Sequence, residues 1–237
     1  MSNGSYSRLS GKHGSTPLHF APRCSGVVTK LLQEKHSKLF DTVDEKGFTV
    51  LHQWAKIGDF GTIDCHFMFK IHTMQAKAFR ELIYKENKNE GDNPLHIAAR
   101  FNKDDNYFVA PMLNIHDFQL FDKSWKKSNF PPWKSKNKRA DTPLHLALYS
   151  KHEKIALHFL YRDSTLCQIC NKKGESPLFV AVATGCAQVV ERILRILEEP
   201  DFSILNRNDG QTVLHMLKLC SGKVLLLHHF PFREVSH

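Results

Sequence analysis

Five histidines stand at equivalent places in a repeated hexapeptide, and histidine is a common metal ligand and general base. They are His19, His52, His96, His145 and His215. Copies separated by a whole repeat do not converge on one ion, so a shared metal site or catalytic centre is disfavoured. The remaining copy carries Phe179 at this place, which a packing position tolerates and a metal ladder does not. We therefore interpret each imidazole as a structural group that bonds backbone and polar groups between adjacent repeats.

Two other groupings have residue types that can do chemistry. Cys167 and Cys170 form a C-x-x-C pair of the kind found in zinc half-sites and redox centres, but no second pair accompanies it, and we interpret both as core residues. A cysteine–histidine nucleophile is conceivable in the group Asp64, Cys65, His66 and His72. The chain lacks G-x-S-x-G, H-E-x-x-H and a glycine-rich phosphate loop. We predict that it is not an enzyme and needs no cofactor or metal.

The hexapeptide that positions the histidines reads T-P-L-H-x-A in full at 16–21 and 142–147. Copies start at residues 16, 49, 93, 142, 176 and 212, with spacings of 33, 44, 49, 34 and 36 residues. A leading Thr or Ser caps free backbone N–H groups, and proline suits the first helical position. Leucine and alanine then face the next repeat. Each copy therefore predicts the start of a helix.

A second helix and a turn complete each unit. In the fifth unit we expect Gly185 to end the first helix, and Val189, Val190, Ile193, Leu194 and Leu197 to line one face of the second. Turn residues recur at 44–47, 171–174 and 208–210. No unit can bury its apolar face alone, so the units are expected to stack.

The period near 33 headed by T-P-L-H resembles ankyrin repeats. The resemblance implies an all-α solenoid of about six helix-turn-helix repeats over residues 14–220, between a disordered tail at 1–13 and an irregular tail at 221–237. The run 171–185 is similar to the N-K-x-G-x-S-P-L-x-x-A-x-x-x-G unit of plant accelerated-cell-death-type ankyrin proteins. That likeness implies a protein–protein interaction adaptor in plant defence or cell-death signalling. Members of that family usually continue into a PGG-type segment with several transmembrane helices. This sequence holds no such segment, so we expect either a truncated or short form or a soluble relative.

Units two and three exceed the period by 11 and 16 residues. In unit two we expect a longer loop at 64–70 and an extended second helix, whose apolar face carries Ile71, Met74, Ala78 and Leu82. In unit three the excess is an insertion at 122–139, which we expect to project as a loop because Pro131 and Pro132 forbid a continuous helix. Its basic residues are Lys123, Lys126, Lys127, Lys134, Lys136, Lys138 and Arg139. They contribute +7 of the formal net charge of +9, so the basic character is local.

Three interpretations of this basic loop are open. With Trp125, Phe130 and Trp133 among its lysines, it suits an anionic membrane surface or an acidic protein. It also suits nucleic acid, through phosphate contacts and aromatic stacking. In the third interpretation it is a solvated insertion whose aromatic side chains fold back on the repeats.

Stacked units of this kind present the exposed end of each first helix and the turn tips on one concave face. This face is predicted to bind a protein partner through Arg23, Lys56, Ile57, Arg100, Phe101 and Tyr149, with Lys172 and Lys173 at a turn tip. Arg100, Phe101 and Tyr149 are of residue types enriched at interface hot spots.

The composition of the chain indicates the cellular compartment of the protein. No stretch reaches 18 apolar residues, and the polar start of the chain does not resemble a secretory signal. Six cysteines without such a signal indicate free thiols in a reducing compartment. We expect a cytoplasmic protein without a transmembrane segment, or one bound at the cytoplasmic face of the plasma membrane.

Overall fold

The structure is a computed structural model, and it describes residues 11–20, 42–58, 81–102, 109–110, 112–113, 130–197 and 207–213. Within these ranges the chain forms seven α-helices and no strand, so the predicted all-α class is confirmed. The α-helices are α1 (Pro17–Phe20), α3 (Val50–Ile57), α6 (Pro94–Phe101), α8 (Pro143–Tyr149), α9 (Glu153–Arg162), α10 (Pro177–Thr184) and α11 (Ala187–Ile196). Three short 3₁₀-helices are η2 (Lys12–Gly14), η6 (Pro132–Lys134) and η7 (Ser164–Gln168).

The helices of the hexapeptides begin where the motif predicts, through reciprocal caps. The side chain of Thr49 accepts a hydrogen bond from the backbone N–H of His52, and the backbone N–H of Thr49 donates to His52 Nδ1 at 3.1 Å. Asn93 and His96 make the same pair of bonds at the start of α6. The side chain of Ser176 caps α10. Each cap satisfies backbone donors that a helix end otherwise leaves unpaired.

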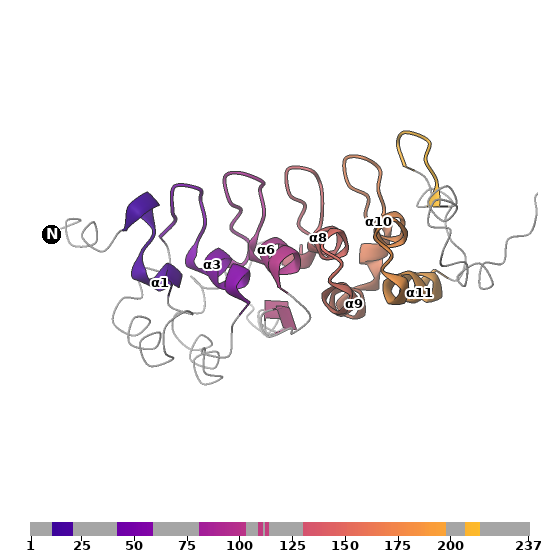
Figure 1. The fold of residues 1–237 in the computed structure, drawn as a ribbon, viewed down its shortest axis with the longest axis horizontal. Helices are drawn as coiled ribbons and strands as arrows, with labels where there is room; N and C mark the ends of the chain where they lie inside the picture. The colour runs from indigo at the N-terminus through magenta and orange to yellow at the C-terminus, as the bar shows by residue number, and fades with distance from the viewer. Residues whose placement is uncertain are drawn as a thin grey trace, which may run out of the picture.

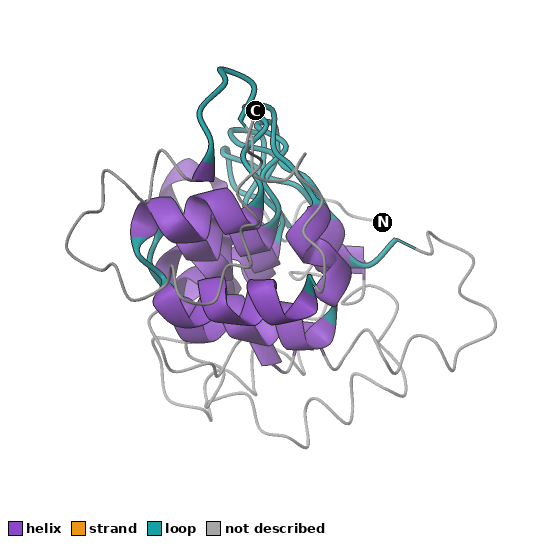
Figure 2. Cartoon of the chain, turned by 90° about the vertical axis from the view of Figure 1, so that its right-hand side faces the viewer, coloured by secondary structure: helices purple, strands orange, loops and turns teal. Residues whose placement is uncertain are grey.

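The five helices of the hexapeptides, α1, α3, α6, α8 and α10, lie side by side in chain order and form one row (Figure 1). Helices α9 and α11 form a second layer that packs against α8 and α10. The turns between units project from the same side of the row, and they overlay when the molecule is viewed along its length (Figure 2). The architecture is therefore a linear stack with a helical body and an edge of turns.

The core follows the hexapeptide from unit to unit. Its leucines are fully buried in all five described copies: Leu18, Leu51, Leu95, Leu144 and Leu178. Burying a leucine side chain stabilises a fold by about 2 kcal/mol. Val189, Val190 and Ile193 of α11 are buried as predicted, and Gly185 ends α10 in the left-handed conformation. These residues join neighbouring units into one continuous apolar core.

The prediction of a projecting loop at 122–139 is wrong for residues 130–139. Pro132 starts the 3₁₀-helix η6, which packs against α8, and the side chain of Trp133 is only 4 % exposed. Residues 137–140 form the regular turn of unit four, equivalent to 171–174 in unit five. From Pro132 onward the chain lies against the stack instead of projecting from it.

Several predicted features lie outside the described residues. These are both chain tails apart from 11–13, the loop at 64–70, the face formed by Ile71, Met74 and Ala78, the segment 122–129, and His215. Leu82, the last residue of the predicted face in unit two, is described and buried.

The fourth position of the regular turns needs a left-handed backbone. Gly174 has φ 77°, whereas Ala140 has φ 59° at the same position of unit four. A Cβ atom on Gly174 would collide with the side chain of Asn208 and lie 2.8 Å from its backbone nitrogen. We therefore expect Gly174→Ala to lower the free energy of unfolding by about 2 kcal/mol, and Ala140→Gly to raise it by about 1 kcal/mol. Urea unfolding measures both, and a shift of the same sign in the two variants would contradict this account.

Candidate functional site

The histidines join each unit to the next. The backbone N–H of Thr49 donates to His52 Nδ1, so the proton of the neutral ring sits on Nε2, which donates to the carbonyl of Asp92 at 2.9 Å. In the same way the Nε2 atom of His96 bonds the carbonyl of Asp141 at 2.9 Å. His19 and His145 make equivalent bonds to Phe48 and Glu175. The prediction that these imidazoles bond adjacent repeats is confirmed for the four described copies, which we call the histidine ladder.

Burial sets the protonation of the histidine ladder. Loss of solvent lowers the pKa of His52 and His96 from 6.5 to about 4, although the carbonyls that they contact raise it in part. Burial also lowers the pKa of His19 and His145. All four imidazoles are therefore neutral near pH 7, as the assigned hydrogen bonds require.

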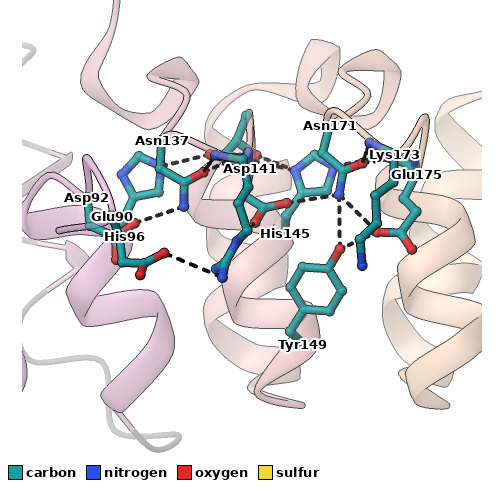
Figure 3. A network of polar contacts seen from close by, with 12 residues as sticks. Glu90, Asp92, His96, Asn137, Asp141, His145, Tyr149, Asn171, Lys173 and Glu175 are labelled. Atoms are coloured by element: carbon teal, nitrogen blue, oxygen red, sulfur yellow. Dashed lines mark hydrogen bonds and ion pairs between the residues drawn. The ribbon is translucent and has the colours of Figure 1, made fainter.

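A second ladder, of asparagines, holds the turns. Asn137 Oδ1 accepts hydrogen bonds from the backbone N–H groups of Arg139 and Asp141, while its Nδ2 donates to Asp92 Oδ1 of the preceding unit at 2.9 Å. Asn171 repeats this arrangement one unit later, with Nδ2 donating to Asp141 Oδ1 at 2.9 Å (Figure 3). The buried carboxylates of Asp92 and Asp141 are thus anchored by the turn that follows them.

The turn tips are bonded to one another through the backbone. One N–H···O bond of 2.8–3.2 Å links each tip to the previous one: Lys88 to Lys46, Lys138 to Glu90, Lys172 to Arg139, and Asn208 to Lys173. These bonds hold successive tips in register along the edge of the stack. Side chains at equivalent tip positions therefore lie one per unit along this edge.

Two arginines and a tyrosine are anchored by acidic side chains of the stack. Arg100 Nη2 lies 2.8 Å from the fully buried Asp92 Oδ2, and Arg139 Nε lies 3.0 Å from Asp141 Oδ2. The hydroxyl of Tyr149 donates to Glu175 Oε2 at 2.5 Å. Burial, together with this hydrogen bond, raises the pKa of Tyr149, so its hydroxyl stays protonated. The buried acids here are thus occupied by neighbouring side chains.

A cleft of about 500 Å³ opens between the turns at 137–140 and 171–174 and the C-terminal ends of α6 and α8. It is lined by Arg100, Lys138, Arg139, Asp141, Leu146, Tyr149, Ser150, Asn171, Lys172 and Lys173. Five of these residues are cationic and one is acidic, so we call it the basic cleft. Its volume lies within the range of about 300–1,000 Å³ that is usual for ligand sites.

The basic cleft brings together residues from two separate predictions. Arg100, Tyr149, Lys172 and Lys173 were predicted for the concave face, and Lys138 and Arg139 were assigned to the basic loop. Sequence reasoning missed that these last two belong to a turn. The available signal is Asn137, which stands five residues before the hexapeptide, as Asp44 and Asn171 do in their units.

Other predicted site residues lie elsewhere. The Lys56 ammonium sits 5.3 Å from the centre of the Phe101 ring, and Ile57 ends α3 in the same row of helices. Arg23 is outside the described residues, as are Lys123, Trp125, Lys126 and Lys127 of the basic segment.

The described remainder of the basic segment supports the stack. The buried Trp133 donates from Nε1 to Asp163 Oδ2 at 3.1 Å, and the Arg162 guanidinium lies 4.8 Å from the centre of its ring. Lys134 pairs with the same carboxylate at 2.9 Å. Lys136 donates to the carbonyl of Cys170 at 3.2 Å. The interpretation in which the aromatic side chains fold back on the repeats is confirmed for Trp133.

The C-x-x-C pair is packed into the fold. Cys167 is buried as predicted, Cys170 is half-buried, and both are free thiols. Loss of solvent raises the pKa of each thiol, which makes the reactive thiolate less available.

No family model matches this sequence, and no curated protein matches it. Among the described residues, no helix combines the length and apolar character needed to cross a membrane.

Proposed function

We propose that the chain is an ankyrin-type repeat scaffold that binds a protein partner in the basic cleft. The observation that carries this proposal is the convergence of Arg100 and Tyr149 with the lysine-rich turns on one concave surface. The T-P-L-H repeat and the row of helices with projecting turns support the ankyrin-type assignment.

The side chains of the basic cleft suit recognition. The buried Asp92 and Asp141 carboxylates are held by arginine and asparagine, and the histidine ladder bonds backbone carbonyls. The exposed residues that line the cleft are Lys138, Arg139, Lys172, Lys173 and Tyr149, and Tyr149 is 41 % exposed. Tyrosine and arginine are enriched among residues that dominate binding energy.

The biological setting follows the resemblance to plant accelerated-cell-death-type proteins. We place the scaffold in defence or cell-death signalling, in the cytoplasm or at the cytoplasmic face of the plasma membrane. The alternative, binding of anionic lipid or nucleic acid by the basic segment 123–139, loses Trp133 as an inserting or stacking residue because its ring is buried.

Site-directed cross-linking tests the proposed function. A photoreactive phenylalanine derivative replaces Ser150, which lines the basic cleft, or His158, which is exposed on α9 in the outer layer. In a plant cell extract, a discrete protein should be captured from position 150 and not from position 158. Equal capture from both positions, or none from position 150, would contradict the proposal.

A further inference from the structure

We propose that the basic cleft takes an acidic peptide segment, with carboxylates spaced along the turn tips and an apolar side chain over Tyr149. This inference rests on the proposed function and specifies the chemistry of the partner. Three features support it: the lysines that form no ion pair, the regular spacing of the turns, and the exposed Tyr149 at the floor of the cleft.

The basic cleft carries more cationic side chains than its neighbouring carboxylates pair with. Arg100 and Arg139 each pair with a buried aspartate. Lys138, Lys172 and Lys173 form no ion pair with any carboxylate among the described residues, and all three are exposed. Lys138 Nζ donates to the carbonyl of Lys88, and the charge of Lys173 helps to lower the pKa of Glu175. Three ammonium groups that belong to no ion pair thus stand on two adjacent turns. A cleft lined by one sign of charge attracts ligands of the other sign.

The register of the turns spaces these charges. Lys88, Lys138 and Lys172 occupy one position in three successive turns, because each donates its backbone N–H to the preceding tip. Neighbouring packed helices lie about 8–10 Å apart, and an extended peptide advances about 3.3 Å per residue. A segment laid along the tips therefore passes from one lysine to the next in about three residues. Acidic residues at every third position match this spacing.

The floor of the cleft favours a peptide over a polyphosphate. The hydroxyl of Tyr149 is engaged with Glu175, so the exposed ring offers an apolar contact. Asp141 lines the cleft, and Glu175 accepts a hydrogen bond from Asn171, which also lines it. Because Arg139 pairs with Asp141 and Arg207 with Glu175, the floor adds little net charge, and the exposed Tyr149 is the feature that favours a ligand with an apolar side chain.

The experiment is a selection of random display peptides on the purified chain. Selected peptides are then measured against three variants. Lys172→Glu/Lys173→Glu reverses the rim charge without removing a side-chain hydrogen bond. Lys154→Glu/Arg195→Glu makes the same charge change on the outer helices α9 and α11. Ser150→Trp fills the cleft, and thermal unfolding of each variant verifies that it folds.

We expect peptides rich in Asp and Glu around an apolar residue, which bind at least about tenfold more weakly to Lys172→Glu/Lys173→Glu and unchanged to Lys154→Glu/Arg195→Glu. Neutral or basic peptides that Ser150→Trp excludes would overturn this inference and leave the proposed function standing. Peptides that bind the Ser150→Trp variant as tightly as the unchanged protein would overturn both the inference and the proposed function. Tighter binding of a single-stranded oligonucleotide or of phosphatidylserine vesicles, lost in Lys172→Glu/Lys173→Glu, would overturn the inference in favour of a phosphate ligand.

Discussion

Replacing Asn171 by alanine is expected to lower the free energy of unfolding by about 4 kcal/mol. The Asn171 Nδ2 atom lies 2.9 Å from Asp141 Oδ1, 2.9 Å from Glu175 Oε2 and 3.0 Å from the Tyr149 hydroxyl. Its Oδ1 atom accepts the backbone N–H groups of Lys173 and Glu175. The substitution leaves a buried carboxylate without its amide donor and removes the side-chain bonds that shape the turn. A buried charge that loses a partner is costly because water does not replace it.

Urea unfolding of Asn171→Ala measures this loss. The matched control is Asn208→Ala, which removes an exposed asparagine whose Nδ2 donates to the carbonyl of Lys172 at 3.1 Å. We expect the control to change the free energy of unfolding by about 1 kcal/mol or less. Equal losses in the two variants would show that the asparagine ladder does not hold the units together.

Acid is expected to destabilise the stack before most carboxylates protonate. The imidazoles of His52 and His96 keep a pKa of about 4 in the folded chain, against 6.5 in the unfolded chain. Between these values the unfolded chain binds more protons, so the free energy of unfolding falls as the pH is lowered. Each of the two contributes about 3 kcal/mol at neutral pH. Together the two histidines account for a loss of about 6 kcal/mol, most of which occurs between pH 6.5 and pH 4.

The fifth unit supplies a control for this pH dependence, since Phe179 stands naturally at the histidine position. The double variant His52→Phe/His96→Phe should be less stable at pH 7, because the carbonyls of Asp92 and Asp141 lose a donor. Its free energy of unfolding should also change less between pH 6.5 and pH 4. An unchanged pH slope in this variant, measured by urea unfolding across the range, would rule out the two imidazoles as the cause.

The helical body of the fold was predictable because its causes are local. A capping residue, a proline, a buried leucine and a histidine recur together, so the start of α8 at Pro143 and the burial of Leu144 follow from six residues. The role of the histidines followed from their repetition, which excludes convergence on one ion. The end of α10 at Gly185 followed from the left-handed backbone that glycine favours.

The turn of unit four was missed because two local signals were misleading. Ala140 stands where other units have glycine, yet it adopts the left-handed conformation. The basic residues before it resemble a solvated loop by composition alone. The burial of Trp133 depends on Asp163 and Arg162, about 30 residues away in the sequence. Pairings at this distance, like that of Asn137 with Asp92, are set by the stacking of units and not by local sequence.

The histidine ladder and the asparagine ladder together hold the backbone around the basic cleft. The histidines tie each helix start to the next unit, and the asparagines tie each turn to the preceding buried aspartate. Lys172 and Lys173 are consequently displayed from a fixed backbone while their ammonium groups stay exposed. A preformed site of this kind loses little conformational entropy when it binds a partner.

The position of a captured protein on the chain tests the central claim most directly. The measurement is the yield of cross-linked partner from a photoreactive residue at Ser150 compared with that from His158, in the same extract and at the same expression level. We predict a discrete product from position 150, which the Lys172→Glu/Lys173→Glu background reduces. A partner captured from position 158 with equal or higher yield would place the binding surface on the outer helices and contradict the account.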